Sequence, residues 1–165
     1  MSDQHPSEPI PPTDATTPMD FYGNYTHQAP HDSENFYDAS GVKISDKERS
    51  IAVLSHILPI IFLFLSAGTL SIFSPLIIWF IYQDNPDYRF ASASAARAFN
   101  FNLTLMTINI VAIILTLLTF GLAIFVLFIT LVITSLMLLI FHINGALSAR
   151  QGTIYEYPLQ IRVLK

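Results

Sequence analysis

The residues best equipped for chemistry in this chain are polar side chains set inside long apolar stretches. Five of them combine imidazole or amide groups with apolar neighbours: His56, Asn100, Asn102, His142 and Asn144. Such side chains are costly in an apolar helix and usually face the interior of a helix bundle. There they bind a solute, or they hold neighbouring helices together by hydrogen bonds. A histidine can also take up a proton near neutral pH.

These five residues lie at one depth if the stretches that carry them are helices. At a rise of 1.5 Å per residue, His56 lies about 10 Å beyond Arg49, and His142 lies about 12 Å before Arg150. Asn100, Asn102 and Asn144 fall about 5–9 Å from the nearest arginine by the same measure. One interpretation is a polar cavity that opens toward the charged residues. The other, which we favour, is a set of interhelical hydrogen bonds that fix the helix register.

The sequence offers no suitable residues for redox, metal-dependent or acid–base catalysis. The chain has no cysteine, which excludes disulfides and thiolate metal sites. Two histidines without a carboxylate at the same depth fall short of the usual three or four metal ligands. Asp84 and Asp87 flank Asn85 and Pro86, a pattern typical of a turn before a helix. We therefore expect no enzymatic activity, no cofactor and no metal, and the lack of a basic patch argues against nucleic acid.

The distribution of charge indicates what must hold the polar residues in place. The chain has 165 residues, of which 52% are hydrophobic and 12% charged. Between residues 50 and 149 only four are charged: Asp84, Asp87, Arg89 and Arg97. A hundred residues with so few charges cannot cover a water-soluble globule. The sequence predicts an integral membrane protein.

Three apolar blocks, at 51–82, 98–119 and 121–147, define the expected helices. The first block is too long for one span of about 20 residues, and residues 66–69 (SAGT) suggest a turn within it. We expect an all-α, four-helix transmembrane bundle with helices at about 48–66, 70–83, 90–119 and 121–150, followed by a C-terminal segment, 151–165. The second helix is short and carries Pro75, so it is either a tilted span or a re-entrant segment.

The positions of the basic residues predict the orientation. With four helices, all eight Lys and Arg residues lie on one side, whereas three helices would divide them five to three. Cytoplasmic loops of membrane proteins carry the excess of Lys and Arg. We therefore expect a multi-pass protein of the bacterial cytoplasmic (inner) membrane with both termini in the cytoplasm. Trp79, Tyr155 and Tyr157 are then expected at the cytoplasmic headgroup level.

Residues 1–45 form an expected disordered, acidic tail. Six of the ten prolines lie there among Ser, Thr and Asp residues, without any apolar run. Such a segment cannot bury enough surface to fold alone. It serves either as a solvated tether or as a linear motif that binds a partner.

Small residues recur at helical spacing on the third and fourth helices. Because small side chains allow two helices to approach closely, they predict helix packing near the cytoplasmic side. A homodimer contact is the alternative. The residues are Ala91, Ser94, Ala95 and Ala98, then Gly145 and Ala149.

The order of several short motifs resembles a bacterial family of small four-helix membrane proteins of unknown function, which is itself similar to the twenty-kilodalton membrane subunit of the chloroplast inner-envelope protein import translocon. The resemblance covers about residues 46–165. It implies a four-helix bundle and suggests a part in protein translocation. The histidine of the family's His-Ala pair is replaced here by Ser94. The motifs are DKE at 46–48, AVLSH at 52–56, SPLIIW at 74–79, AFNFN at 98–102, ARQG at 149–152 and YEYPL at 155–159.

The expected function is that of a non-enzymatic component of a membrane assembly, related to protein translocation by resemblance only. Its expected partners are the lipid bilayer and other membrane proteins or further copies of the chain. The alternative is a small transporter or channel that uses the polar cavity.

Overall fold

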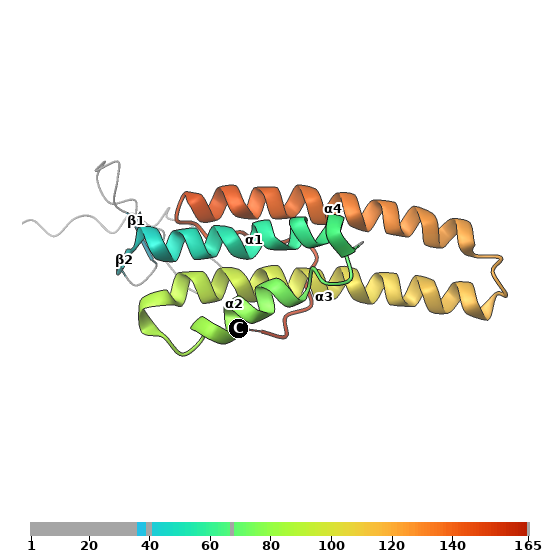
Figure 1. Cartoon of the computed structure of the whole chain (residues 1–165), viewed down its shortest axis with the longest axis horizontal. Helices are drawn as coiled ribbons and strands as arrows, with labels where there is room; N and C mark the ends of the chain where they lie inside the picture. Colours follow the sequence, from blue (N-terminus) through green and yellow to red (C-terminus); the bar gives the residue numbers. More distant parts are fainter. Residues whose placement is uncertain (1–35, 39–40, 67, 165) are drawn as a thin grey trace, which may run out of the picture.

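A computed structural model describes residues 36–38, 41–66 and 68–164. It confirms an all-α membrane-type fold with four helices (Figure 1). The described elements are β1 (Phe36–Tyr37), β2 (Lys43–Ile44), α1 (Asp46–Ser66), α2 (Phe73–Tyr82), the short 3₁₀ helix η1 (Pro86–Tyr88), α3 (Arg89–Leu118) and α4 (Ile124–Arg150).

Three of the helices, α1, α3 and α4, are long and apolar enough to cross a membrane. The fourth, α2, has only 10 residues and is therefore about 15 Å long, half the thickness of a hydrocarbon core of about 30 Å. It cannot cross unaided, so its length agrees with the re-entrant alternative. α2 packs against one half of α3, and the α3–α4 hairpin continues beyond the turn between α1 and α2 (Figure 1).

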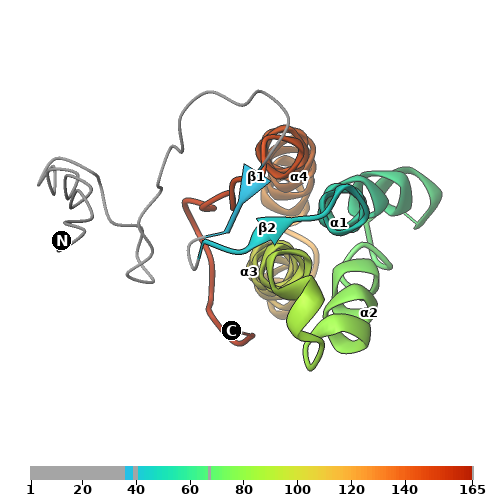
Figure 2. The ribbon, with the colours of Figure 1, turned by 90° about the vertical axis from the view of Figure 1, so that its left-hand side faces the viewer.

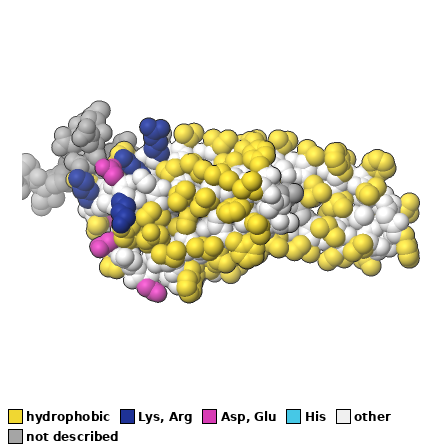
Figure 3. Space-filling view, in the orientation of Figure 1, with side chains coloured by type: hydrophobic (Ala, Val, Ile, Leu, Met, Phe, Trp, Pro, Cys, Tyr) yellow, Lys and Arg dark blue, Asp and Glu magenta, His cyan; other side chains and the backbone are white. Residues whose placement is uncertain are grey.

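The four helices alternate in direction, which brings one set of helix termini together. This end of the bundle, here called the charged end, contains the first residues of α1 and α3 and the last residues of α2 and α4 (Figure 1). Lys, Arg, Asp and Glu side chains gather there, while the remaining visible surface is largely apolar (Figure 3). At the opposite end, α3 and α4 are joined by the expected corner at Phe120 and Gly121, whose φ angles are 50° and 89°.

A small antiparallel hairpin of β1 and β2 covers part of the charged end. Phe36 pairs with Ile44, and both pack against Ala52 and Ala149 of the bundle. Phe36 and Ile44 fall in the tail that the sequence predicts to be disordered. They are ordered in the structure because their apolar side chains pack against the helices. The expected disorder of residues 1–35 lies outside the described residues.

The C-terminal segment, described as far as residue 164, folds back into the bundle. It turns at Gly152, which has a φ of 69°, and its chain runs back alongside α3 (Figures 1 and 2). The backbone N–H of Ile161 donates to Thr104 Oγ1 at 2.8 Å. This return of the chain brings residues 155–164 against the polar positions of α3.

Candidate functional site

A hydrogen-bonded group in the interior, here called the His–Tyr network, joins α1, α3, α4 and the C-terminal segment. It consists of His56, Asn102, His142 and Tyr157. The hydroxyl of Tyr157 lies 2.8 Å from Nδ1 of His56 and 3.2 Å from Nδ1 of His142. His142 Nε2 lies 2.8 Å from Oδ1 of Asn102. Each of the four residues is less than 5% exposed.

The network also reaches the turn between α1 and α2. The amide nitrogen of Asn102 donates to the backbone carbonyl of Ser71 at 2.9 Å. Ser71 is itself buried, and its hydroxyl donates to the carbonyl of Gly68. Asn102 therefore anchors the start of the short helix α2 at the depth of the His–Tyr network.

Close packing surrounds Tyr157. Its ring is stacked on that of Phe101 with centroids 4.5 Å apart. Position 145 of α4 has room only for glycine, because a Cβ there would lie 2.9 Å from the Tyr157 hydroxyl and from His56 Nδ1. Burial raises the pKa of the Tyr157 phenol well above its usual value, with a smaller contribution from Tyr155. The phenol is therefore a neutral donor.

Asn100 binds the backbone of the C-terminal segment rather than the network. Its Oδ1 accepts the N–H groups of Val163 at 3.0 Å and Leu164 at 2.9 Å. Its Nδ2 donates to the Leu164 carbonyl at 2.8 Å. Together with Thr104, one turn further along α3, Asn100 holds an extended stretch of chain through its peptide groups.

The structure brings His56, Asn102 and His142 into one hydrogen-bonded group, whereas the side chain of Asn100 is hydrogen-bonded to the C-terminal segment. Asn144 is different, because its side chain is exposed on the outside of α4. The sequence also places Tyr157 at the headgroup level, whereas it is 4% exposed and inside the bundle. The space expected for a polar cavity is occupied by Tyr157 and its neighbours.

Ion pairs fix the segment next to Tyr157. Arg97 of α3 is 4% exposed and forms an ion pair with Glu156. Arg162 also contacts Glu156, at 3.9 Å. The sequence could have indicated Glu156, since it is the only acidic residue after Asp87 and has to face a group of basic residues.

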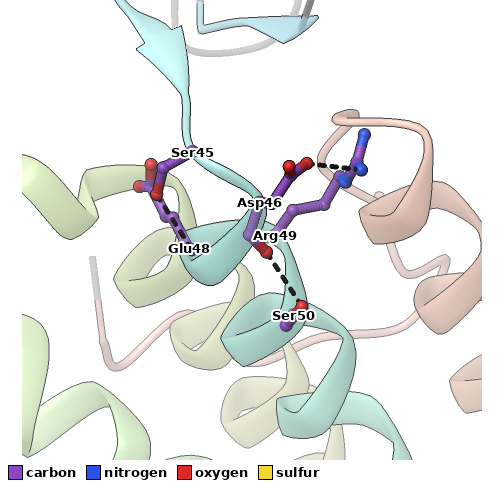
Figure 4. A network of polar contacts seen from close by, with 5 residues as sticks. All are labelled: Ser45, Asp46, Glu48, Arg49 and Ser50. Atoms are coloured by element: carbon purple, nitrogen blue, oxygen red, sulfur yellow. Dashed lines mark hydrogen bonds and ion pairs between the residues drawn. The ribbon is translucent and has the colours of Figure 1, made fainter. Parts of the chain in front are cut away.

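A buried carboxylate, that of Glu48, lies at the charged end. Its backbone N–H donates to Ser45 Oγ at 3.1 Å (Figure 4), a contact typical of a helix N-cap. Its side chain reaches the start of α3, where Oε1 accepts from the N–H groups of Phe90 at 2.7 Å and Ala91 at 3.4 Å. A negative charge is favourable there because the first N–H groups of a helix have no partner inside it.

The small residues predicted to allow helix packing are all buried within this single chain. Their burial accounts for the close approach of α1, α3 and α4 without a second copy. They are Ala91, Ser94, Ala95, Ala98, Gly145 and Ala149.

The chemistry available to the site is hydrogen bonding and proton uptake. Within residues 36–38, 41–66 and 68–164, no three His, Asp or Glu side chains are grouped so that they could hold a metal ion. The only titratable groups in the His–Tyr network are the two imidazoles and the phenol.

We expect Asn100→Ala to loosen the end of the C-terminal segment. The substitution removes three hydrogen bonds, but the freed groups can reach water, so the net loss should be about 1–2 kcal/mol. Amide hydrogen exchange of residues 161–164 should therefore become about tenfold faster. Asn144→Ala is the matched control, because Asn144 is exposed. Equal exchange rates in the two variants would contradict the role given to Asn100.

Comparison with known proteins identifies one matching family. The family model described as the magnetosome magnetite crystal formation protein family matches residues 47–164. No curated protein and no solved structure matches the chain. The resemblance to the import translocon subunit receives no support from these comparisons.

Proposed function

The chain belongs to the magnetosome magnetite crystal formation protein family, and from this membership we propose that it is a non-enzymatic component of the membrane assembly in which magnetite crystals form. Its partners are then the lipid bilayer and other membrane proteins of that assembly. The family match covers all four helices and nearly all of the C-terminal segment.

One structural observation supports a membrane component over a catalyst. Four polar side chains inside the bundle, those of His56, Asn100, Asn102 and His142, bond to one another, to Tyr157 or to backbone groups of the same chain. Their hydrogen bonds stabilise helix contacts, each by about 0.6–2 kcal/mol. These contacts give the four side chains a structural role.

The distribution of charge supports an orientation. Lys and Arg side chains gather at the charged end (Figure 3), and positively charged segments are retained in the cytoplasm. We place the charged end, where α1 begins and α4 ends, on the cytoplasmic side of the bacterial inner membrane or of a membrane derived from it, so that both chain termini enter from the cytoplasm.

Deletion of the gene in a magnetite-forming bacterium tests the proposed function. We expect magnetite crystals of altered size or number by electron microscopy, and restoration by the wild-type chain. Crystals indistinguishable from those of the parent strain would contradict the proposal.

The same strain distinguishes the alternative of a small transporter or channel. That alternative is favoured by the polar side chains at one depth and requires His56 and His142. The double variant His56→Gln, His142→Gln keeps hydrogen-bonding side chains in the network but has no imidazole; at wild-type level by immunoblot, it should still restore the crystals if the protein is a structural component. Failure of this variant alone would favour transport.

A further inference from the structure

The hydrogen bonds of the His–Tyr network determine where each proton lies. The Ser71 carbonyl can only accept, so the amide nitrogen of Asn102 must face it and Oδ1 must face His142. His142 therefore carries its hydrogen on Nε2. In a neutral imidazole the other nitrogen is then a bare acceptor, so the Tyr157 hydroxyl donates to His142 Nδ1.

The same reasoning fixes the state of His56. A phenol has one hydrogen, and that of Tyr157 is used for His142, so its oxygen must accept from His56. His56 therefore carries its hydrogen on Nδ1, and its Nε2 is a bare acceptor. No group in the described part of the chain lies within hydrogen-bond distance of this buried Nε2.

The two histidines thus differ in how they could accept a further proton. His56 can take one on Nε2 without breaking a hydrogen bond. His142 can take one only on Nδ1, and Tyr157 would have to give up its donated bond. His56 is therefore the proton acceptor of the network.

A protonated His56 has no counter-charge nearby among the described residues. It faces His142 from α4, with ring centroids 5.9 Å apart, and Tyr157 from the C-terminal segment, with Tyr155 packed behind it. The C-terminal segment and α1 carry two glutamates, and both have other partners. Glu156 forms ion pairs with Arg97 and Arg162, and Glu48 accepts from the start of α3. An unpaired charge in such a setting is strongly unfavourable until water reaches it.

We propose that proton uptake at Nε2 of His56 draws water to the unpaired charge, and that this water displaces Tyr157 and releases residues 155–164 from α3. The C-terminal segment is then a proton-controlled plug over the polar groups of Asn100, Asn102 and Thr104. It is suited to release because it has little regular structure, and apart from its ion pairs it is held by the network and by the backbone contacts of Asn100 and Thr104. This inference does not depend on the proposed role in crystal formation.

Paired spin labels can measure release in the full chain. The native sequence lacks cysteine, so Leu147→Cys on α4 and Leu159→Cys on the segment can be labelled selectively; both positions are 53% exposed. The distance distribution is recorded from about pH 8 to about pH 4, which brackets the ordinary histidine pKa of about 6.5. We expect one narrow distance at high pH and a broad, longer distribution at low pH.

Substitution of each histidine identifies the acceptor. His56→Gln can still donate to Tyr157 but cannot be protonated, so the distance should stay narrow throughout. His142→Gln retains His56 and should still show the transition. A wild-type distance that does not change with pH, or a transition that persists in His56→Gln, would overturn the proposal.

A direct measurement of the protons does not require a variant of the network. Nitrogen NMR distinguishes a protonated ring nitrogen from a bare one, and replacement of His5, His27 and His31 by Asn leaves only His56 and His142. At about pH 8 we expect one ring with hydrogen on Nδ1 and one with hydrogen on Nε2. Two rings of the same tautomer would contradict the hydrogen-bond assignment.

Discussion

Replacing Gly145 with alanine is expected to destabilise the protein by about 1–3 kcal/mol, the usual cost of an added methyl group in a tightly packed core. The new Cβ would lie 2.9 Å from both His56 Nδ1 and the Tyr157 hydroxyl. Neither atom is at the end of a flexible chain, because both belong to rings held by hydrogen bonds. In an open helix position the same substitution would stabilise by about 1 kcal/mol, so the clash reverses the sign.

Thermal unfolding in detergent measures this effect as a lower Tm. The double variant Gly145→Ala, Tyr157→Phe tests its origin, since phenylalanine lacks the hydroxyl that meets the new Cβ. Because the two sites are in contact, the double variant should lose less stability than the sum of the single variants. A higher Tm for Gly145→Ala, or strictly additive losses, would show that the close packing at Gly145 has no energetic consequence.

The second large effect is expected for Glu48→Ala, which should lower the free energy of unfolding by about 2–3 kcal/mol. The substitution leaves the buried N–H groups of Phe90 and Ala91 without their acceptor, and hydrogen bonds to charged groups contribute about 1.5–3 kcal/mol. It also removes a negative charge from the start of α3. The loss should separate α1 from α3 at the charged end.

Two further variants isolate the role of the carboxylate. Glu48→Gln keeps an oxygen acceptor and should lose clearly less stability than Glu48→Ala. Asp46→Ala removes only an exposed ion pair with Arg49, which contributes at most about 1 kcal/mol. If Asp46→Ala and Glu48→Ala lowered the Tm equally, the contact of Glu48 with α3 would contribute no more to stability than an exposed ion pair.

The depth of the interior polar residues could be predicted because the helical rise is constant. Counting from the nearest charged residue was sufficient to bring His56, Asn102 and His142 to one level. The error at Asn144 arises from rotation rather than depth. Two residues along a helix correspond to a turn of about 200°, so Asn144 faces away from the bundle when His142 faces inward.

The position of Tyr157 could not be predicted from local pattern. The fold-back of the C-terminal segment depends on Asn100 and Thr104, which are more than 50 residues away in sequence. Amphipathic aromatic residues after a last helix usually indicate the headgroup level, and that interpretation was wrong here. Ser45 and Glu48 have the spacing of a capping box, but no local pattern indicates that the Glu48 carboxylate reaches another helix.

The difference in helix length gives the molecule the shape of a wedge. α1 and the ten-residue α2 do not reach the tip of the α3–α4 hairpin, so the molecule is broad at the charged end and narrows to that hairpin (Figure 1). Inserted in a bilayer, the protein displaces more lipid from the leaflet at its charged end than from the other. Lipids pack around such a shape with least strain where the membrane is convex on the charged side.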